Sequence, residues 1–289
     1  MREVGDFTLR DDARDFLVTS EVVPTKVAAR AIVKCFQRCF QMRRSSSNSK
    51  VNDWVEPLKS LQRSDERDAV VERIIAEYPE RVITPDEKLL RLRKRPTNPS
   101  APEEYDSPPT GVRGAGRFES DDFQVLYASQ DLEVCIHECR VTVEDELYLA
   151  TLKPRNAIQC LDLTTVLKED ATEFESLDMA VHMLFLAGAH SYPIWQAIAR
   201  GALKAGFDGV VYPSDFSLVR TGAPPFETVY GLSVRRFDSY RETARALSIP
   251  NLAVFGQPVT AGVLAVECVN KLVLRRVAYD VHFGPVGVT

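Results

Sequence analysis

Hydrophobic residues recur at helical spacing in the first part of the chain. Over residues 25–42 (TKVAARAIVKCFQRCFQM) they form one apolar stripe opposite a basic face, which predicts an amphipathic helix. A polar stretch over 43–50 is typical of a flexible connection, and a second helical pattern with an acidic first turn covers 64–78. We therefore expect residues 1–84 to form a small helical N-terminal region.

Short runs rich in Val, Leu, Ile and Tyr predict strands in the rest of the chain. The first, LLRLRKR at 89–95, is followed by a long proline-rich loop. Further strands are expected at residues 124–128, 146–152, 157–163, 209–212, 228–232, 263–269 and 271–279. Two helices lie between them, at 131–140 and 192–205, where apolar side chains return every third or fourth residue. The fold class that follows is α+β, with one domain over 85–289 and no internal repeat.

Charge is divided unevenly along the chain. The formal net charge is −5, but residues 1–100 carry 20 basic and 16 acidic side chains, and residues 101–289 carry 16 and 25. The larger, acidic part is a poor candidate for direct nucleic-acid binding, which depends on Lys and Arg at phosphates. The basic runs Lys34–Arg44 and Arg91–Arg95 keep such binding as a hypothesis to be tested.

The six cysteines do not predict a metal site. Two pairs, Cys35 with Cys39 and Cys135 with Cys139, lie at helical i, i+4 spacing among apolar residues, without the short CxxC loops of structural zinc sites. The N-terminus lacks the layout of a secretory signal, and no apolar run reaches the ~20 residues that span a bilayer. We expect a reduced, cytoplasmic protein with no bound metal and no membrane segment.

Four residues have side chains and positions suited to a polar site. Arg117 lies in GVRGAGRFES, where glycines let the backbone approach a ligand and a guanidinium can pair with phosphate oxygens. Tyr127 lies at the end of a predicted strand, Glu138 borders the buried stripe of the helix at 131–140, and Ser214 follows a strand directly. Each also has an ordinary interpretation: a surface arginine, a packed aromatic, a solvated helix glutamate and a turn serine.

The spacing of these residues is more specific than any one of them. The pattern GRF-x8-LYA-x9-HE, followed later by AGFDGVVYPS, resembles the RES family, which is named for its Arg, Glu and Ser. The resemblance begins near Lys88 and implies an ADP-ribosyltransferase-like split β-sheet core with flanking helices. It also implies an NAD-consuming toxin of a RES–Xre type toxin–antitoxin system.

The resemblance implies a role for each matching residue. Arg117 would hold the phosphates or adjoining ribose of NAD, Phe118 would be the aromatic that follows it, and Tyr127 would line the nicotinamide pocket. Glu138 would be the catalytic glutamate, and Ser214 would complete the polar site. A fixed carboxylate suits this reaction, because breaking the nicotinamide–ribose bond creates an oxocarbenium-like centre. NAD is then the substrate, and no cofactor is expected.

The resemblance leaves the product and the partners open. ADP-ribose could pass to water or phosphate, or to a protein as in a mono-ADP-ribosyltransferase, and we favour NAD degradation. An antitoxin of helix-turn-helix type is implied as a partner, and a homo-oligomer is compatible with the sequence. Two departures, Glu119 in place of the family's usual Asn and Ala223-Pro224 in place of Gly-Asn, motivate another hypothesis. In this hypothesis the chain is an inactive RES scaffold that serves as an interaction protein.

Overall fold

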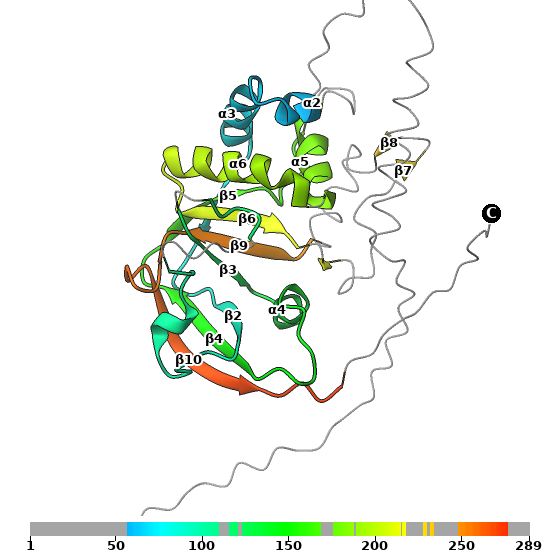
Figure 1. Ribbon diagram of the computed structural model, residues 1–289. Helices are drawn as coiled ribbons and strands as arrows, with labels where there is room; N and C mark the ends of the chain where they lie inside the picture. The colour runs from blue at the N-terminus through cyan, green and yellow to red at the C-terminus, as the bar shows by residue number, and fades with distance from the viewer. Residues whose placement is uncertain are drawn as a thin grey trace, which may run out of the picture.

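One eight-stranded sheet forms the body of the molecule (Figure 1). The computed structural model describes residues 57–109, 116–120, 123–168, 176–187, 189–214, 216–217, 228–229, 232–233 and 248–276. The strands of the sheet are β1 (Glu80–Ile83), β2 (Leu89–Lys94), β3 (Val125–Ser129), β4 (Leu147–Pro154), β5 (Ile158–Asp162), β6 (Gly209–Pro213), β9 (Pro250–Phe255) and β10 (Leu264–Leu272). A separate antiparallel pair consists of β7 (Thr228–Val229) and β8 (Leu232–Ser233).

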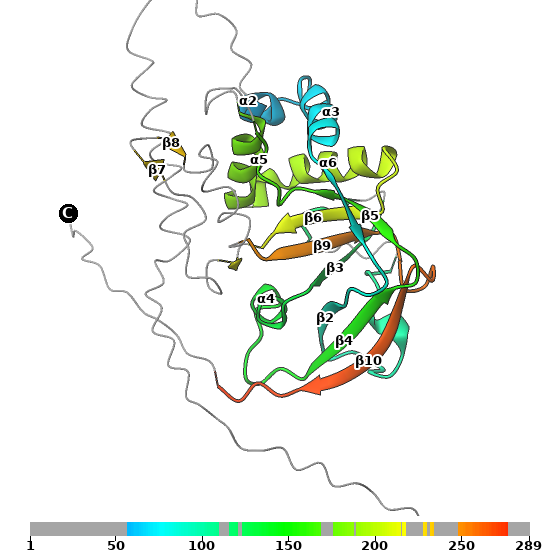
Figure 2. The same ribbon diagram turned by 180° about the vertical axis from the view of Figure 1, so that it is seen from behind.

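The sheet is divided into two parts between β3 and β2. Its strand order is β1-β5-β6-β9-β3-β2-β4-β10, and all neighbours are antiparallel except β5 and β6. Strand β3 pairs with β9 over its whole length, but it pairs with β2 only at Leu90↔Ser129. Seen from behind, β2, β4 and β10 curve away from the five other strands (Figure 2). This is the split sheet that the resemblance implies.

Helices cover one face of both parts. The helices are α2 (Pro57–Gln62), α3 (Arg67–Glu77), α4 (Leu132–Glu138), α5 (Leu177–Leu186) and α6 (Tyr192–Lys204), with 3₁₀ turns η2 (Pro102–Tyr105) and η3 (Ala189–Ser191). Helices α5 and α6 pack on the five-strand part, and α3 crosses α6 where Gly201 leaves room for Val71 and Ile75. Helix α4 packs on β2 and β4 through Cys135, Leu92 and Leu147. The opposite face is closed by Tyr105 of η2 and a second apolar cluster.

Arg91 fills the gap where β2 and β3 separate. Its side chain is only 7% exposed. Nη1 donates to the backbone oxygen of Tyr127 at 2.8 Å, and Nη2 donates to that of Asp106 at 2.7 Å. Burial lowers the pKa of Arg91 to about 10, so the guanidinium stays charged at neutral pH. A charged side chain thus supplies the hydrogen bond that the missing strand pairing would have made to Tyr127.

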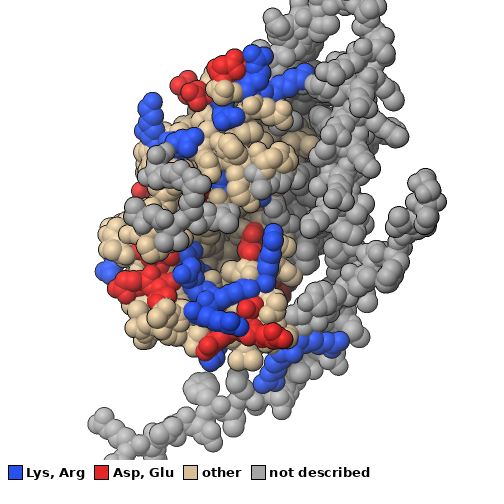
Figure 3. Space-filling view, viewed as in Figure 1, with Lys and Arg blue, Asp and Glu red and all other residues tan. Residues whose placement is uncertain are grey.

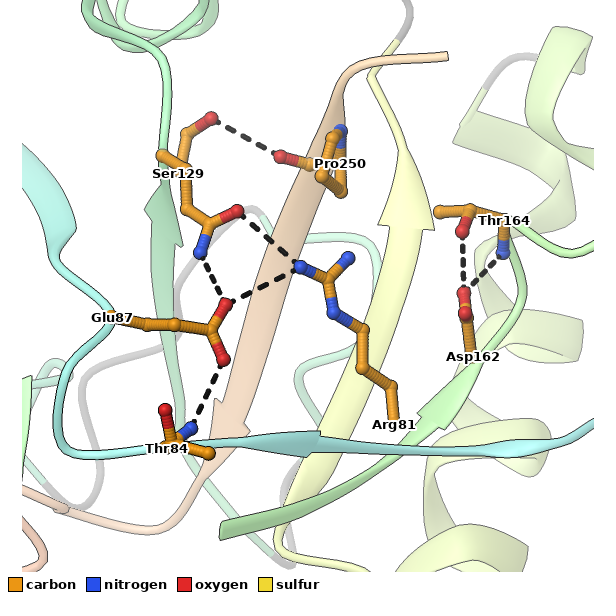
Figure 4. Close-up of polar contacts among 8 residues, drawn as sticks. Arg81, Thr84, Glu87, Ser129, Asp162, Thr164 and Pro250 are labelled. Carbon is orange, nitrogen blue, oxygen red and sulfur yellow. Dashed lines mark hydrogen bonds and ion pairs between the residues drawn. The ribbon is translucent and has the colours of Figure 1, made fainter. Parts of the chain in front are cut away.

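A polar cluster ties β1 to the start of α4. Figure 4 shows Arg81 reaching from β1 to Glu87, with Nη2 at 3.5 Å from Oε2, and the same atom lies 3.4 Å from Oε1 of Gln130. Gln130 Nε2 donates to Glu87 at 2.8 Å, and Ser129 Oγ donates to the oxygen of Pro250 at 3.2 Å. These contacts hold Gln130, which comes just before the N-cap residue of α4.

Most predicted elements are present. The α+β class is confirmed, as are the helices near 64–78, 131–140 and 192–205 and the strands near 89–95, 124–128, 146–152, 157–163 and 209–212. The helix predicted over 25–42 and the connection over 43–50 lie outside the described residues. Strand β1 lies before residue 84 and pairs with β5, while the division of the chain at that residue stays a prediction. None of the described helices is long and apolar enough to cross a membrane.

Three strand predictions are wrong in detail. The strands predicted at 263–269 and 271–279 are one strand, β10, which continues through Asn270 because it pairs with β4 on both sides of a register shift between Val266 and Cys268. It ends at Leu272, and residues 273–276 are not in a strand. The strand predicted at 228–232 is two paired strands of two residues each. Strand β9 and strand β1 were not predicted at all.

We expect Arg91→Met to lower the free energy of unfolding by about 2–5 kcal/mol, because the backbone oxygens of Tyr127 and Asp106 would lose their charged donor. Urea unfolding followed by circular dichroism measures this change. Arg93→Met is the matched control, since Arg93 lies two residues along the same strand and is only half-buried. It should cost less than about 1 kcal/mol. Equal losses in the two variants would contradict the role given to Arg91.

Candidate functional site

Polar residues come together where β6 ends and its neighbour β9 begins. Strands β6 and β9 pair antiparallel, with Tyr212 opposite Asn251 and Pro213 opposite Pro250. Ser214 follows β6, and its amide continues the ladder by donating to the oxygen of Ile249 at 2.9 Å. Ser214 and Asn251 are therefore held by backbone pairing, and their side chains are 5% and 3% exposed.

Glu138 contacts both of these residues. Its Oε1 accepts hydrogen bonds from Ser214 Oγ at 2.9 Å and from Asn251 Nδ2 at 2.7 Å. Ser214 Oγ in turn accepts from the amide of Phe216 at 3.1 Å, so its single proton is directed to the carboxylate. Glu138 itself is exposed, unlike its two donors. The result is a carboxylate that is fixed from behind and accessible from solvent.

Helix α4 holds Glu138 in this place. Asp131 caps its N-terminus by accepting from the amide of Val134 at 3.0 Å. Cys135 Sγ donates to the oxygen of Leu90 at 3.4 Å, and Cys139 Sγ to that of Leu92 at 3.6 Å. Burial raises the pKa of the Cys135 thiol to about 12. These cysteines therefore attach the helix to β2. No cluster of three metal-ligating side chains occurs among the described residues.

The segment that carries Arg117 is anchored by Tyr127. The amide of Phe118 donates to Tyr127 Oη at 2.9 Å, and a Cβ on Gly116 would lie 2.4 Å from that same oxygen. Glycine at 116 is thus required for the close approach. Phe118 is fully buried, whereas Arg117 is half-buried. The segment places one aromatic in the core and leaves the adjacent Arg117 half-buried.

Tyr127 contacts the Arg117 segment and is also a neighbour of Asn251, which binds Glu138. Tyr127 lies opposite Ala253 of β9, and Ser129 lies opposite Asn251, so Tyr127 and Asn251 are diagonal neighbours on one face of the sheet. Desolvation raises the pKa of Tyr127, and its hydroxyl stays protonated. The role of this side chain in lining a nicotinamide pocket stays a prediction.

Glu119 has a local partner. Its Oε2 accepts from the amide of Gly116 at 3.1 Å, which closes the turn around Arg117. Desolvation raises the pKa of the Glu119 carboxyl. The departure from the family's Asn therefore replaces one hydrogen-bonding side chain by another. The second departure, Ala223-Pro224, lies outside the described residues.

Asn251 was missed by the sequence analysis. It stands at the start of β9, in the run PNLAVF, and lies 113 residues from Glu138 along the chain. The available signal was a polar residue at the head of a short apolar run, directly after a proline. That signal identifies a strand start but not the carboxylate that the amide meets.

We expect the melting temperature of Glu119→Gln, compared with that of the native protein, to rise as the pH increases from about 4 to 7. The folded-state pKa of Glu119 is raised, so the folded protein holds this proton more tightly than the unfolded chain does, and stability falls as the carboxyl ionises. The glutamine amide cannot ionise, yet its oxygen can still accept from Gly116. Melting temperatures of both proteins across this range measure the effect, and a constant difference would contradict it.

Comparison with known proteins gives one family and one solved structure. No curated protein matches the chain. A chain in a structure described as "Crystal structure of the M.tuberculosis MbcT-MbcA toxin-antitoxin complex" is similar, with 16% sequence identity and a TM-score of 0.41 over 70% of this chain and 91% of that chain. Residues 88–221 match the family model described as RES domain. That range contains Arg117, Tyr127, Glu138 and Ser214, and the match confirms the resemblance to the RES family that the sequence predicts.

Proposed function

We propose that this protein is an NAD-cleaving enzyme that breaks the nicotinamide–ribose bond and acts as a growth-inhibiting toxin. The observation that carries the proposal is the Glu138 carboxylate, which accepts hydrogen bonds from Ser214 and Asn251 at the edge of a split sheet. NAD is the substrate in this proposal, and no further cofactor takes part.

The carboxylate supplies what the bond cleavage requires. As nicotinamide leaves, positive charge develops on the ribose C1′ and ring oxygen, and a fixed negative group nearby stabilises it. The hydrogen bonds from Ser214, which follows β6, and from Asn251 of β9 prevent Glu138 from turning away. They keep the position of its negative charge constant between substrate and transition state. The leaving nicotinamide takes the bonding electrons, and a nucleophile then attacks C1′.

Arg117 is proposed to bind the diphosphate of NAD. A guanidinium offers two parallel N–H donors that match phosphate oxygens, and Arg117 is half-buried, so part of it reaches solvent. Phe118 is fully buried and packs edge-on against Trp195 and Tyr212 at ring centroid distances of 5.4 and 4.9 Å. We assign Phe118 the role of anchoring Arg117 rather than that of touching NAD.

The acceptor of ADP-ribose separates this proposal from its alternative. Water or phosphate as acceptor gives a glycohydrolase or phosphorylase, whereas a protein side chain gives a mono-ADP-ribosyltransferase. Incubation of the purified protein with NAD, followed by mass spectrometry of small molecules and proteins together, distinguishes them. An antitoxin of helix-turn-helix type is the proposed partner, on the basis of the RES family.

Direct nucleic-acid binding by the run Arg91–Arg95 receives little support. Arg91 is buried, and Lys94 Nζ lies 2.8 Å from a carboxylate oxygen of Asp145. On the face shown in Figure 3, Lys and Arg side chains lie among Asp and Glu side chains, and no uniformly basic stripe is formed. Lys271, for example, lies 2.7 Å from Glu146 Oε1. Phosphate backbones are bound by unpaired cations, which such pairing removes.

We expect Glu138→Gln to lower kcat for nicotinamide release from NAD by at least about 100-fold, because the negative charge at the reacting centre is lost. Gln keeps the size of the side chain and an oxygen that accepts from Ser214 and Asn251. Glu133→Gln is the matched control, since Glu133 is an exposed residue of the same helix. Normal turnover by folded Glu138→Gln would contradict the mechanism, and no turnover by the native protein would favour the inactive-scaffold hypothesis.

A further inference from the structure

Four buried aromatic side chains lie together beneath the Arg117 segment. Their exposed fractions are between 0% and 8%, and they come from the segment itself, α5, α6 and β6: Phe118, Phe185, Trp195 and Tyr212. The Phe185 and Trp195 ring centroids are 4.2 Å apart with a 35° angle between the planes. Phe185 also stacks on Tyr212 at 6.1 Å and 7°. The rings fix one another, so the surface that they present is rigid.

The guanidinium of Arg117 lies over two of these rings. Its Cζ atom is 5.5 Å from the Phe185 ring centroid and 5.6 Å from that of Trp195. A cation within ~6 Å of a ring face is attracted by the electrons of the ring, and a guanidinium can stack there. A ring provides this attraction through its electrons and carries no formal negative charge.

We infer that Phe185 and Trp195 are positioning residues that orient the Arg117 guanidinium toward a diphosphate ligand. This inference rests on the proposed function for the identity of the ligand, but its geometry does not depend on cleavage. Arg117 is attached to the core by its neighbour Phe118, which fixes the backbone. The two rings act on the far end of the side chain, where the donors are.

The positioning matters because of the length of the arginine side chain. An unrestrained arginine has several rotatable bonds, and binding a ligand must immobilise them at an entropic cost. Rings that already hold the guanidinium in one orientation remove part of that cost before the ligand arrives. Loss of a ring should therefore weaken ligand binding, while the bond-breaking step at Glu138 proceeds as before.

The test measures the dissociation constant for ADP-ribose, which carries the diphosphate and lacks the nicotinamide bond. Phe185→Leu removes the ring but keeps an apolar side chain, and we expect it to weaken ADP-ribose binding by about 2- to 30-fold, the range of a cation–π contact. With NAD, KM should rise by a similar factor and kcat should change by less than about 2-fold.

Leu184→Ala is the control for stability. Leu184 is a buried neighbour on α5 within the same apolar cluster, and its loss creates a cavity without removing a ring. It should destabilise the fold and leave the ADP-ribose dissociation constant within about 2-fold of native. Equal weakening in Leu184→Ala and Phe185→Leu would show that general loosening of the core is responsible and would overturn the inference.

A second background tests whether Phe185 acts through Arg117. Arg117→Lys keeps the charge, so binding stays measurable, but a compact ammonium replaces the planar guanidinium. In that background Phe185→Leu should cost less than about 2-fold, because little orientation remains to be lost. The same loss in both backgrounds would overturn the inference.

Trp195 provides an optical signal of the same contact. The chain has two tryptophans, so Trp54→Phe leaves Trp195 as the single emitter. ADP-ribose should change its emission in the Trp54→Phe protein and leave it unchanged after Arg117→Ala. An emission change that persists without Arg117 would overturn the part assigned to Trp195.

These outcomes are separable from failure of the proposed function. Binding of ADP-ribose with the predicted coupling, but no nicotinamide release from NAD, would leave this inference standing and overturn the proposed enzyme activity. Nicotinamide release with an unchanged KM in Phe185→Leu would overturn the inference alone. Absence of ADP-ribose binding by the native protein would overturn it as well.

Discussion

Strands β2 and β3 share one residue pair, and the buried guanidinium of Arg91 completes the joint between them. Because the strands separate, α4 attaches to β2 through its cysteines and ends near the edges of β6 and β9. The position of Glu138 is therefore a consequence of where the sheet divides. A charged residue can occupy this joint because two backbone oxygens accept hydrogen bonds from its guanidinium.

Two groups of side chains lie on one face of the sheet, and each group is held in place in a different way. Ser214 and Asn251 are held by the backbone ladder at strand ends, so their positions depend on register. Arg117 is held by its neighbours in a segment without regular structure: Phe118 in the core, Tyr127 at the Phe118 amide and the Phe185 and Trp195 rings at the guanidinium. Strand register precisely places the two side chains that donate hydrogen bonds to the Glu138 carboxylate. The segment instead relies on aromatic packing, since it has no ladder of its own.

The sequence predicts local elements better than the contacts between them. Helices α4 and α6 were recognised because apolar residues return at helical spacing, and β6 because a turn, a Val-Val-Tyr run and a proline bound it. Strand β9 begins with a proline, which lacks the backbone N–H that a strand ladder needs, and it was not predicted. The contacts of Glu138 span 76 and 113 residues, and no periodicity reports on such distances. Ser214 was found through the resemblance, whereas Asn251 and the rings beneath Arg117 required the fold.

Glu119 illustrates why a departure from a family pattern needs the structure before it is interpreted. From the sequence, a negative charge beside Arg117 argues against an anion site. In the structure its carboxylate turns back to the Gly116 amide and is half-buried. The hydrogen bond from the Gly116 amide stabilises the charged carboxylate and gives it a partner within the turn. The residue that motivated the inactive-scaffold hypothesis thus has a structural role in the turn that presents Arg117, and the hypothesis itself stays a prediction for the NAD assay to test.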